Sequence, residues 1–311
     1  MLSRVADSIY WLNRYIERAE NIARFVEVNL NLLLDCSVVV EQQWEPLVST
    51  SGDVEMFRSR YSTPTAENVV RFLTYDETYP NSIMSCLNVA RNNAKAVRDA
   101  ISSEMWEQVN SFYFMVKDSS PDGNLPKLPD FFASVRMASH QFAGVMDATM
   151  SHNEGWHFGQ LGRLIERADK TARILDVKYF LLMPDGFSTA LDELQWIALL
   201  KSTSGYEMYR KAFHQINPRD VACFLVFDRE FPRSIYSCLL HAEKSLYSIS
   251  GNGGTWSNSA ERTLGKLRSQ LDYMSIEEAI DRGLHEFLDE TQSRLNFISQ
   301  GISETFFTLE Y

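Results

Sequence analysis

Cysteine is scarce in this 311-residue sequence, which contains four such residues and no CxxC pair. So few and so scattered cysteines do not make the framework of a disulfide-stabilised secreted domain. The six histidines show no HExxH or other metal-ligand spacing. We therefore expect a protein of a reducing compartment that has no metal site.

Excess positive charge is also missing, since 30 basic residues face 41 acidic ones and the formal net charge is −11. An acidic chain lacks the basic footprint that non-specific nucleic-acid binding requires. No apolar run reaches the length of a membrane span. The opening segment, MLSRVADSIYWLNRYIERAEN, carries charges where a signal peptide needs its apolar core. We expect a soluble, cytoplasmic protein that binds neither nucleic acid nor membrane.

The motifs of common active sites do not occur. There is no nucleophile elbow and no dinucleotide fingerprint, and the glycine-rich segment SGNGG at 250–254 lacks both the GK[ST] ending and the preceding strand of a phosphate loop. Cys86 and Cys238 lie at the edge of apolar stripes, as small buried residues do. The sequence therefore predicts no bound cofactor and no recognisable self-sufficient active site.

What the sequence does contain is an internal repeat. Residues 14–24 (RYIERAENIAR) match residues 163–173 (RLIERADKTAR) at seven of eleven positions, and residues 69–87 match residues 221–239 at ten of nineteen. Ordinary composition would give roughly one match in such a segment. The matches follow the same order in both halves. We infer two duplicated repeats, residues 1–150 and residues 151–311.

Each repeat has the pattern of helices. Apolar residues recur at steps of three and four in 83–101 and again in 235–249, which indicates amphipathic helices, and the alternation typical of strands is essentially missing. The sequence predicts an all-α helical bundle of two pseudo-twofold-related repeats. Six residues favour helix boundaries: Ser188 and Asn217 as N-caps, Pro80 and Pro232 in first turns, and Gly52 and Gly205 at C-terminal ends.

The RxxER segments, Arg14–Arg18 and Arg163–Arg167, are the main candidates for a functional site. On a helix their charged residues gather on the side opposite the apolar stripe. A solvated face would tolerate lysine for arginine, whereas both copies keep arginine, whose planar fork can bond a carboxylate or phosphate twice. We expect a buried polar network where the two halves meet, with a ligand site or plain surface as alternatives. The candidates in the two copies are Arg14, Glu17, Arg18 and Asn21, and Arg163, Glu166 and Arg167.

Other charged pairs in these segments have a simpler interpretation. Glu20 and Arg24 are i,i+4 partners, as are Asp169 and Arg173, and such pairs stabilise a helix by about a few tenths of a kcal/mol. We assign both pairs to stability.

Asp76 and Asp228 each stand four residues before a repeated proline. Carboxylates in such positions commonly cap turns. The alternative is that each of them accepts hydrogen bonds from an arginine of an RxxER segment, so both remain candidates for the same site.

The segments quoted above, together with GWHFGQLGRLIERADKTARILDV in the middle of the chain, resemble the alpha-E family, a bacterial α-helical family named for its Glu-Arg motif. The resemblance spans essentially the whole chain and carries its motif over to Glu17, Arg18, Glu166 and Arg167. Asn13 stands where the family often has the glycine found at position 162. Lys170 stands where the first copy has Asn21, which puts the equivalence of the two copies in question.

This resemblance implies a setting more than a reaction. Alpha-E proteins are encoded beside, or fused to, circularly permuted ATP-grasp proteins, often with transglutaminase-like proteins as well. The implied role is in peptide synthesis or modification by carboxylate–amine ligation, with a peptide or amino acid as substrate. An accessory subunit of an ATP-grasp ligase is the first interpretation. An enzyme using Glu17 or Glu166 as general acid or base is the second, although a neighbouring arginine lowers the pKa of a carboxyl. A stand-alone helical scaffold is the third.

Overall fold

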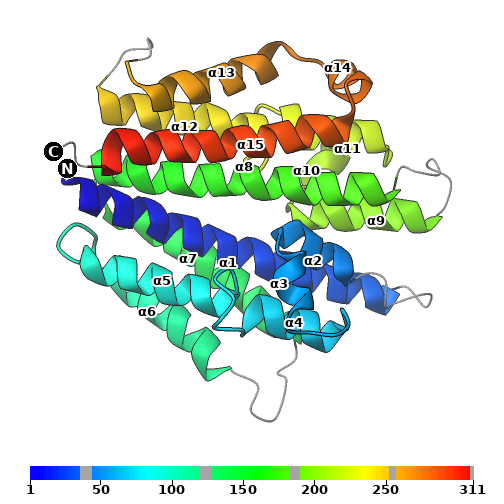
Figure 1. Ribbon diagram of the computed structural model, residues 1–311, viewed down its shortest axis with the longest axis horizontal. Helices are drawn as coiled ribbons and strands as arrows, with labels where there is room; N and C mark the ends of the chain where they lie inside the picture. The colour runs from blue at the N-terminus through cyan, green and yellow to red at the C-terminus, as the bar shows by residue number, and fades with distance from the viewer. Residues whose placement is uncertain (36–43, 120–127, 183–189, 252–256, 309–311) are drawn as a thin grey trace. The chain divides into compact units, whose positions relative to one another are not determined.

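The computed structural model describes residues 1–35, 44–119, 128–182, 190–251 and 257–308, and within them the chain is helical and contains no strand (Figure 1). The prediction of an all-α protein is confirmed. The N-cap predicted at Ser188 lies outside the described residues. The longer helices are α1 (Ser3–Asp35), α5 (Ile83–Ala96), α6 (Ser103–Asp118), α7 (Leu128–Thr149), α8 (Glu154–Leu182), α9 (Ala190–Ser202), α12 (Ile235–Ser250), α13 (Ser259–Tyr273) and α15 (Leu284–Ile302). The shorter ones are α2 (Glu45–Ser51), α3 (Val54–Arg58), α4 (Ala66–Thr74), α10 (Tyr206–Ala212), α11 (Pro218–Phe227) and α14 (Ile276–Asp281).

The chain folds into two compact units, one continuous in sequence and one not. The continuous unit comprises Tyr15–Ser151, and the discontinuous unit comprises Met1–Arg14 together with His152–Tyr311. Helix α1 therefore supplies residues to both units. The division into repeats at residue 150, which the sequence suggests on grounds of ancestry, stays a prediction.

Helix α8 is the centre of the discontinuous unit. It packs along α12 and α15, while α13 packs on both of these, as the green, yellow, orange and red ribbons of Figure 1 show. The apolar residues of α8, among them Leu161, Ile165, Ala168 and Leu175, are buried as the sequence pattern predicts. The same helix also buries Glu166, so its core-facing surface is not purely apolar.

The continuous unit is organised around α5, α6 and α7, which pack in sequence order, with α4 against α5 and α2 against α3 and α4. The predicted apolar stripe of α5 is buried along its whole length, from Ile83 through Leu87 and Ala90 to Ala94. Burial of a full side-chain stripe is the main source of stability for a helix of this length.

The prolines that precede α5 and α12 lie outside those helices, so the prediction of first-turn prolines is wrong. The helices begin at Ile83 and Ile235, and their N-caps are Ser82 and Ser234. Each serine hydroxyl accepts a hydrogen bond from the backbone N–H three residues later, at 3.1 Å. A serine cap satisfies a free N–H that proline cannot, and Pro80 and Pro232 instead shape the turn before it.

The predicted C-terminal glycines behave differently from each other. Gly52 ends α2 in the left-handed conformation (φ 82°), as predicted. Gly205 follows α9 but is not left-handed, because Ser204 takes the positive φ of 57°. A Cβ at position 205 would lie 3.0 Å from the Phe224 ring. That glycine is therefore kept by close packing. The predicted N-cap is confirmed at Asn217, whose side chain accepts from two backbone N–H groups of α11.

Candidate functional site

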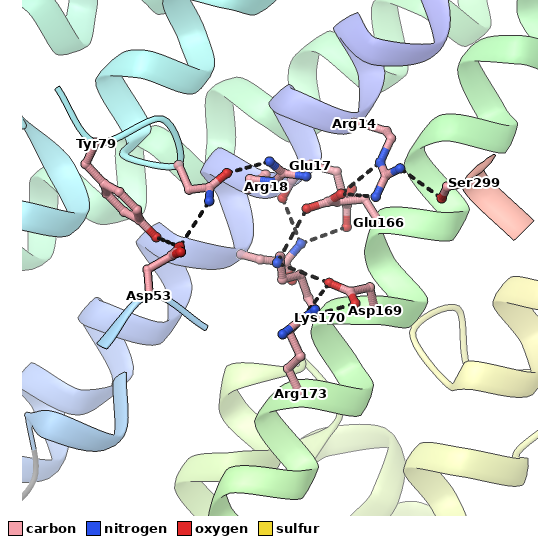
Figure 2. Close-up of polar contacts among 12 residues, drawn as sticks. Arg14, Glu17, Arg18, Asp53, Tyr79, Glu166, Asp169, Lys170, Arg173 and Ser299 are labelled. Carbon is pink, nitrogen blue, oxygen red and sulfur yellow. Dashed lines mark hydrogen bonds and ion pairs between the residues drawn. The ribbon is translucent and has the colours of Figure 1, made fainter. Parts of the chain in front are cut away.

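The two RxxER segments are joined by a buried ion pair inside the discontinuous unit. Arg14 donates from Nε to Oε2 of Glu166 at 2.9 Å, and its Nη2 lies 2.9 Å from the same oxygen (Figure 2). The Glu166 side chain is 0% exposed. A charge so completely removed from water is tolerated only when it is paired. The pair is therefore a requirement of this arrangement of α1 and α8.

The remaining donors of Arg14 are also engaged. Nη1 donates to the hydroxyl oxygens of Ser299 at 3.0 Å and Tyr10 at 3.2 Å. The guanidinium carbon lies 4.8 Å from the centre of the Trp11 ring, in cation–π contact. Arg14 thus connects α1, α8 and α15 within one unit. Lysine has neither the fork nor the flat face that these contacts use.

Glu166 meets a second cation on its other side. The Nζ atom of Lys170 lies 3.6 Å from Oε1 of Glu166 and 3.2 Å from Oδ2 of Asp169. Arg173 donates to Asp169 at 2.9 Å, forming the predicted i,i+4 pair. Burial by itself would raise the pKa of Asp169, but Lys170 and Arg173 outweigh it and hold that pKa below its ordinary value. The contacts thus run from Glu166 to Lys170, Asp169 and Arg173, so that opposite charges alternate from one contact to the next.

The two arginines of the second RxxER segment bond to residues of α8 and of the turn before α12. Arg163 donates to the side chain of Gln160, one turn earlier. Arg167 donates from Nη1 to the carbonyl of Pro232 at 3.4 Å, and Thr171 donates to the carbonyl of Arg233 at 2.9 Å. Both bonds fasten α8 to the turn that precedes α12.

In the continuous unit, Arg18 starts a chain of polar contacts. It donates to Oδ1 of Asn81 at 2.6 Å, and the amide of Asn81 donates to Asp53 at 3.1 Å. The hydroxyl of Tyr79 donates to the same Asp53 oxygen at 2.6 Å (Figure 2). Burial raises the pKa of Tyr79, and the hydrogen bond to Asp53 raises it further, so this phenol stays protonated. The chain fastens α1 to the turn before α5 and to the start of α3.

Glu17 and Asn21 form a second local arrangement on α1. Glu17 is 3% exposed, and the amide of Asn21 donates to its backbone carbonyl at 2.7 Å and to Oε1 at 3.3 Å. With Arg14 and Asn21 also buried, the polar side of this helix is not a solvated face. Whether the network lies where the two halves meet, as the sequence suggests, stays a prediction.

The pair of Glu20 and Arg24 is present as predicted but is buried. Arg24 donates to Glu20 from Nε at 2.9 Å, and the side chains are 6% and 1% exposed. The estimate of a few tenths of a kcal/mol applies to solvated pairs, so it does not apply to this one. The Nη2 atom of Arg24 also lies 3.3 Å from Nε2 of His140 on α7.

Asp76 and Asp228 are turn residues. Asp76 accepts from the backbone N–H and the hydroxyl of Thr78, and Arg60 donates to it at 3.0 Å. Burial pushes the pKa of Asp76 upward, but the bonds from Thr78 and Arg60 leave it below the ordinary value. Asp228 accepts from the backbone N–H groups two and three residues later, those of Glu230 at 2.9 Å and Phe231 at 2.6 Å. Among the described residues, neither carboxylate contacts an arginine of an RxxER segment.

Sequence reasoning missed several residues of these networks. Ser299, Tyr10 and Asp53 carry no repeat or motif that would connect them to an RxxER segment, although Tyr10 lies one helical turn before Arg14 and could have been found by its spacing. Two buried polar residues were missed as well. Asn29 and Lys178 occupy matching positions in the two repeats, because they are 149 residues apart, as the two RxxER segments are.

In the part of the chain that the structure describes, no group of three or more His, Cys, Asp or Glu side chains is placed to hold a metal ion. Across the same residues, no helix combines the length and the apolar character needed to cross a bilayer. Cys86 and Cys238 are buried, and burial raises the pKa of the Cys223 thiol. The arrangement is that of a charge network that holds helices together.

Comparison with known proteins identifies the class of this chain. The sequence model of Alpha-E, described as a predicted alpha-helical domain with a conserved ER motif, matches residues 1–307. The chain belongs to the Alpha-E family. The RxxER segments contain the residue pair for which that domain is described, Glu17-Arg18 and Glu166-Arg167.

Relatives with curated sequences are known from mycobacteria. The chain is 24% identical over 299 residues to an uncharacterized protein of Mycobacterium bovis and, at the same identity, to an uncharacterized protein of Mycobacterium tuberculosis. Each alignment covers 88% of this chain but 33% of the relative, so the chain spans about a third of the length of these proteins. No solved structure matches the chain.

Proposed function

We propose that this protein is a helical accessory subunit of a peptide synthesis or modification system that joins carboxylates to amines. In this proposal a circularly permuted ATP-grasp protein is the ligase and supplies the nucleotide and magnesium sites. A transglutaminase-like protein is a further partner of the same system. The subunit acts in the cytoplasm, where ATP is available, and helps to present or shield the peptide.

One observation carries the choice of an accessory role over a catalytic one. Glu166 is wholly buried and lies between Arg14 and Lys170. A general acid or base must reach the proton that it transfers, and it works best when its pKa is near the operating pH. A carboxylate that is removed from solvent and already in contact with two cations does not meet the first of these conditions. The RxxER segment is better suited to fixing helices than to moving protons.

We further propose that the fold arose by duplication of one helical repeat, with the two copies related by a pseudo-twofold axis. Arg18 bonds the turn before α5, and Arg167 bonds the turn before α12, so matching arginines contact matching turns. Ser82 and Ser234 cap the two following helices in the same way. These parallels support the repeat that the sequence matches suggest.

The length of the mycobacterial relatives supports a role alongside other domains. Two thirds of each relative lies outside the stretch that resembles this chain. An Alpha-E-like region is thus found joined to further sequence, as expected of a module that works with a partner. A stand-alone scaffold is the alternative, favoured by the internal pairing of Arg14 and Glu166.

Co-purification tests the accessory role. The chain and an ATP-grasp protein encoded next to it would be co-expressed, and the complex would be measured by size-exclusion chromatography with light scattering. We expect a stable complex whose ATP consumption depends on an added peptide. An unrelated helical protein in place of this chain is the control. Complete separation with ATP, with ADP and with a non-hydrolysable analogue would exclude the proposal in favour of a stand-alone scaffold.

A further inference from the structure

An open groove with a volume of about 1170 Å³ lies in the discontinuous unit, lined by residues of α12, α13 and α15 and of the α14 region. It involves none of the RxxER residues. Five of its lining side chains are basic and four are acidic, although the chain as a whole carries a net charge of −11. The lining of the groove therefore has one more basic than acidic side chain, whereas the protein as a whole is acidic.

The floor of the groove is a fixed ion pair. Glu243 is buried, and Arg268 donates to its two oxygens at 3.0 and 3.4 Å. Arg268 also donates to Asp272 at 3.2 Å. A Cβ at position 265 would lie 3.2 Å from Oε1 of Glu243, so Gly265 leaves room for this carboxylate. The negative charge of Glu243 is thus offset within the protein.

The other acidic residues of the groove are also bonded within the protein, one by an arginine and two by neutral donors. Glu261 is 1% exposed and accepts from the backbone N–H and hydroxyl of Ser257. Glu290 pairs with Arg294 at 2.8 Å, and Glu278 accepts from the backbone N–H of Ser275 in a capping box. Two of the four lining carboxylates, Glu243 and Glu290, are therefore paired with arginine, and the other two accept from neutral donors.

Two lining cations, Lys266 and Arg282, have no such partners. Both are exposed, and within the described ranges neither side chain makes a hydrogen bond or an ion pair. Lys266 lies in the middle of α13, and Arg282 follows α14. The groove therefore presents two positive charges that the fold itself does not use.

Exposed aromatic side chains accompany these charges. Tyr273 is 87% exposed and lines the groove. A second hollow of about 690 Å³ shares Arg262, Lys266 and Arg294 with the first, and it is lined by Phe297, which is 63% exposed. Large exposed aromatics beside a hollow are typical of surfaces that bind a partner.

The dimensions suit an extended chain better than a compact metabolite. Helix α13 has 15 residues and rises about 1.5 Å per residue, so it is about 22 Å long. An extended peptide spans about 3.3 Å per residue, so six or seven residues cover that length. Pockets for small ligands occupy about 300–1,000 Å³, which the two connected hollows together exceed.

We propose that this groove binds an extended peptide segment of about six residues that carries carboxylate and apolar side chains. Its carboxylates pair with Lys266 and Arg282, and its apolar residues cover Tyr273 and Phe297. The choice of a peptide over other anions rests on the proposed function. The groove would be the place where the accessory subunit holds the chain that the ligase modifies.

Fluorescence anisotropy on the isolated protein tests this inference. The probe is a fluorescein-labelled hexapeptide, Glu-Phe-Glu-Glu-Phe-Glu, and its comparison is the same peptide with glutamine in place of glutamate. We expect the acidic peptide to bind about fivefold to tenfold more tightly, and added salt to reduce this preference because exposed charge pairs are screened.

Variants of the lining residues separate charge from apolar contact. The double variant Lys266→Gln, Arg282→Gln should abolish the preference for the acidic peptide, since each exposed pair contributes up to about fivefold in affinity. Tyr273→Ala should weaken both peptides equally. Lys244→Gln is the matched control, because Lys244 is an exposed cation of α12 that does not line the groove.

Several results would overturn the inference. They are equal binding of the two peptides, an equal loss in Lys244→Gln, tighter binding of a six-nucleotide thymidine strand, or self-association that the double variant removes. The groove and the proposed function fail separately. Loss of peptide binding with an intact ligase complex removes the groove alone, whereas peptide binding without any ligase complex removes the accessory role alone.

Discussion

The guanidinium of Arg14 and the carboxylate of Glu166 lie 2.9 Å apart, although 151 residues separate them in the chain. The first belongs to one RxxER segment and the second to the other. Arg14 keeps its remaining donors for Ser299 and Tyr10, so α1, α8 and α15 share one buried centre. Buried polar side chains, and not the apolar core alone, thus determine how these three helices pack.

Substitution of either partner in this pair should destabilise the protein strongly. Glu166→Gln leaves Arg14 charged and buried, and breaking such a pair costs about 3–5 kcal/mol. Arg14→Lys should cost nearly as much, because an ammonium cannot reach Glu166, Ser299 and the Trp11 face together. Urea denaturation measures the change in the free energy of unfolding.

The control for this pair is Arg58→Lys. Arg58 pairs with Glu45 in an exposed position, so its free energy of unfolding should change by less than about 0.5 kcal/mol. If Arg14→Lys proved as harmless as Arg58→Lys, the buried pair would not be a structural requirement.

Two glycines in long helices should respond to alanine in opposite directions. A Cβ at Gly162 would lie 2.3 Å from the backbone oxygen of Tyr10, which cannot rotate away, so Gly162→Ala should cost about 1–3 kcal/mol. Gly144 on α7 has nothing within 4 Å of its Cβ position, and Gly144→Ala should add about 0.5–1 kcal/mol through helix propensity. Thermal unfolding of both variants checks the contrast, which equal shifts would refute.

Lys178→Met should stabilise the protein. Lys178 is 7% exposed, and burial lowers its pKa from the ordinary 10.5 to about 8. Below pH 8 Lys178 is charged in both the folded and the unfolded protein, and this charge is unfavourable only in the folded protein, where it is buried. Between pH 8 and 10.5 the unfolded chain binds the extra proton, so stability rises with pH in this window by up to about 3 kcal/mol.

The measurement is the unfolding free energy of both proteins from pH 7 to 11. The methionine variant should exceed the wild type by up to about 3 kcal/mol at pH 7, and the difference should shrink toward pH 10.5. Lys244→Met is the control at an exposed lysine and should show no such convergence. A constant difference across the range would mean that the titration of Lys178 is not its cause.

Asp169 should contribute to acid stability. Its folded pKa is lowered by Lys170 and Arg173 against the opposing effect of burial. The stabilisation is fully present above the ordinary value of about 3.9 and is lost as pH falls through the lower folded pKa. Asp169→Asn should therefore be less stable than the wild type at pH 7 and lose less stability on acidification. Asp99→Asn, at an exposed carboxyl, should follow the wild-type acid profile.

Local sequence chemistry predicted much of the fold. The spacing of Ile83, Leu87 and Ala90 was sufficient to find α5 and its buried side, and Asn217 was sufficient to find the start of α11. The prediction started α5 and α12 at Pro80 and Pro232, about one turn too early. The serine caps at Ser82 and Ser234 compete with the prolines for the same boundary, and the helices begin after the caps. Short-range patterns give helices reliably but do not rank two plausible starts.

The candidate site was predicted only in part, for a physical reason. Identity between the two RxxER segments singled out Arg14 and Glu166, but a repeat cannot show which residue bonds which. The contact between Ser299 and Arg14 could be found only from the structure, since a serine on the polar side of a helix has no distinguishing sequence pattern. The groove residues Lys266 and Arg282 look like ordinary surface cations in the sequence, and only the packing of α13 and α15 gives them a shared setting.

The discontinuous unit has a consequence for how the protein is made. Its contacts join Tyr10 and Arg14 to Ser299, on a helix that is translated some 290 residues later. The continuous unit, residues 15–151, can fold as soon as it emerges, since domains generally fold as units during synthesis. Tyr10 and Arg14 can therefore complete their contacts with Ser299 only after α15 has been made.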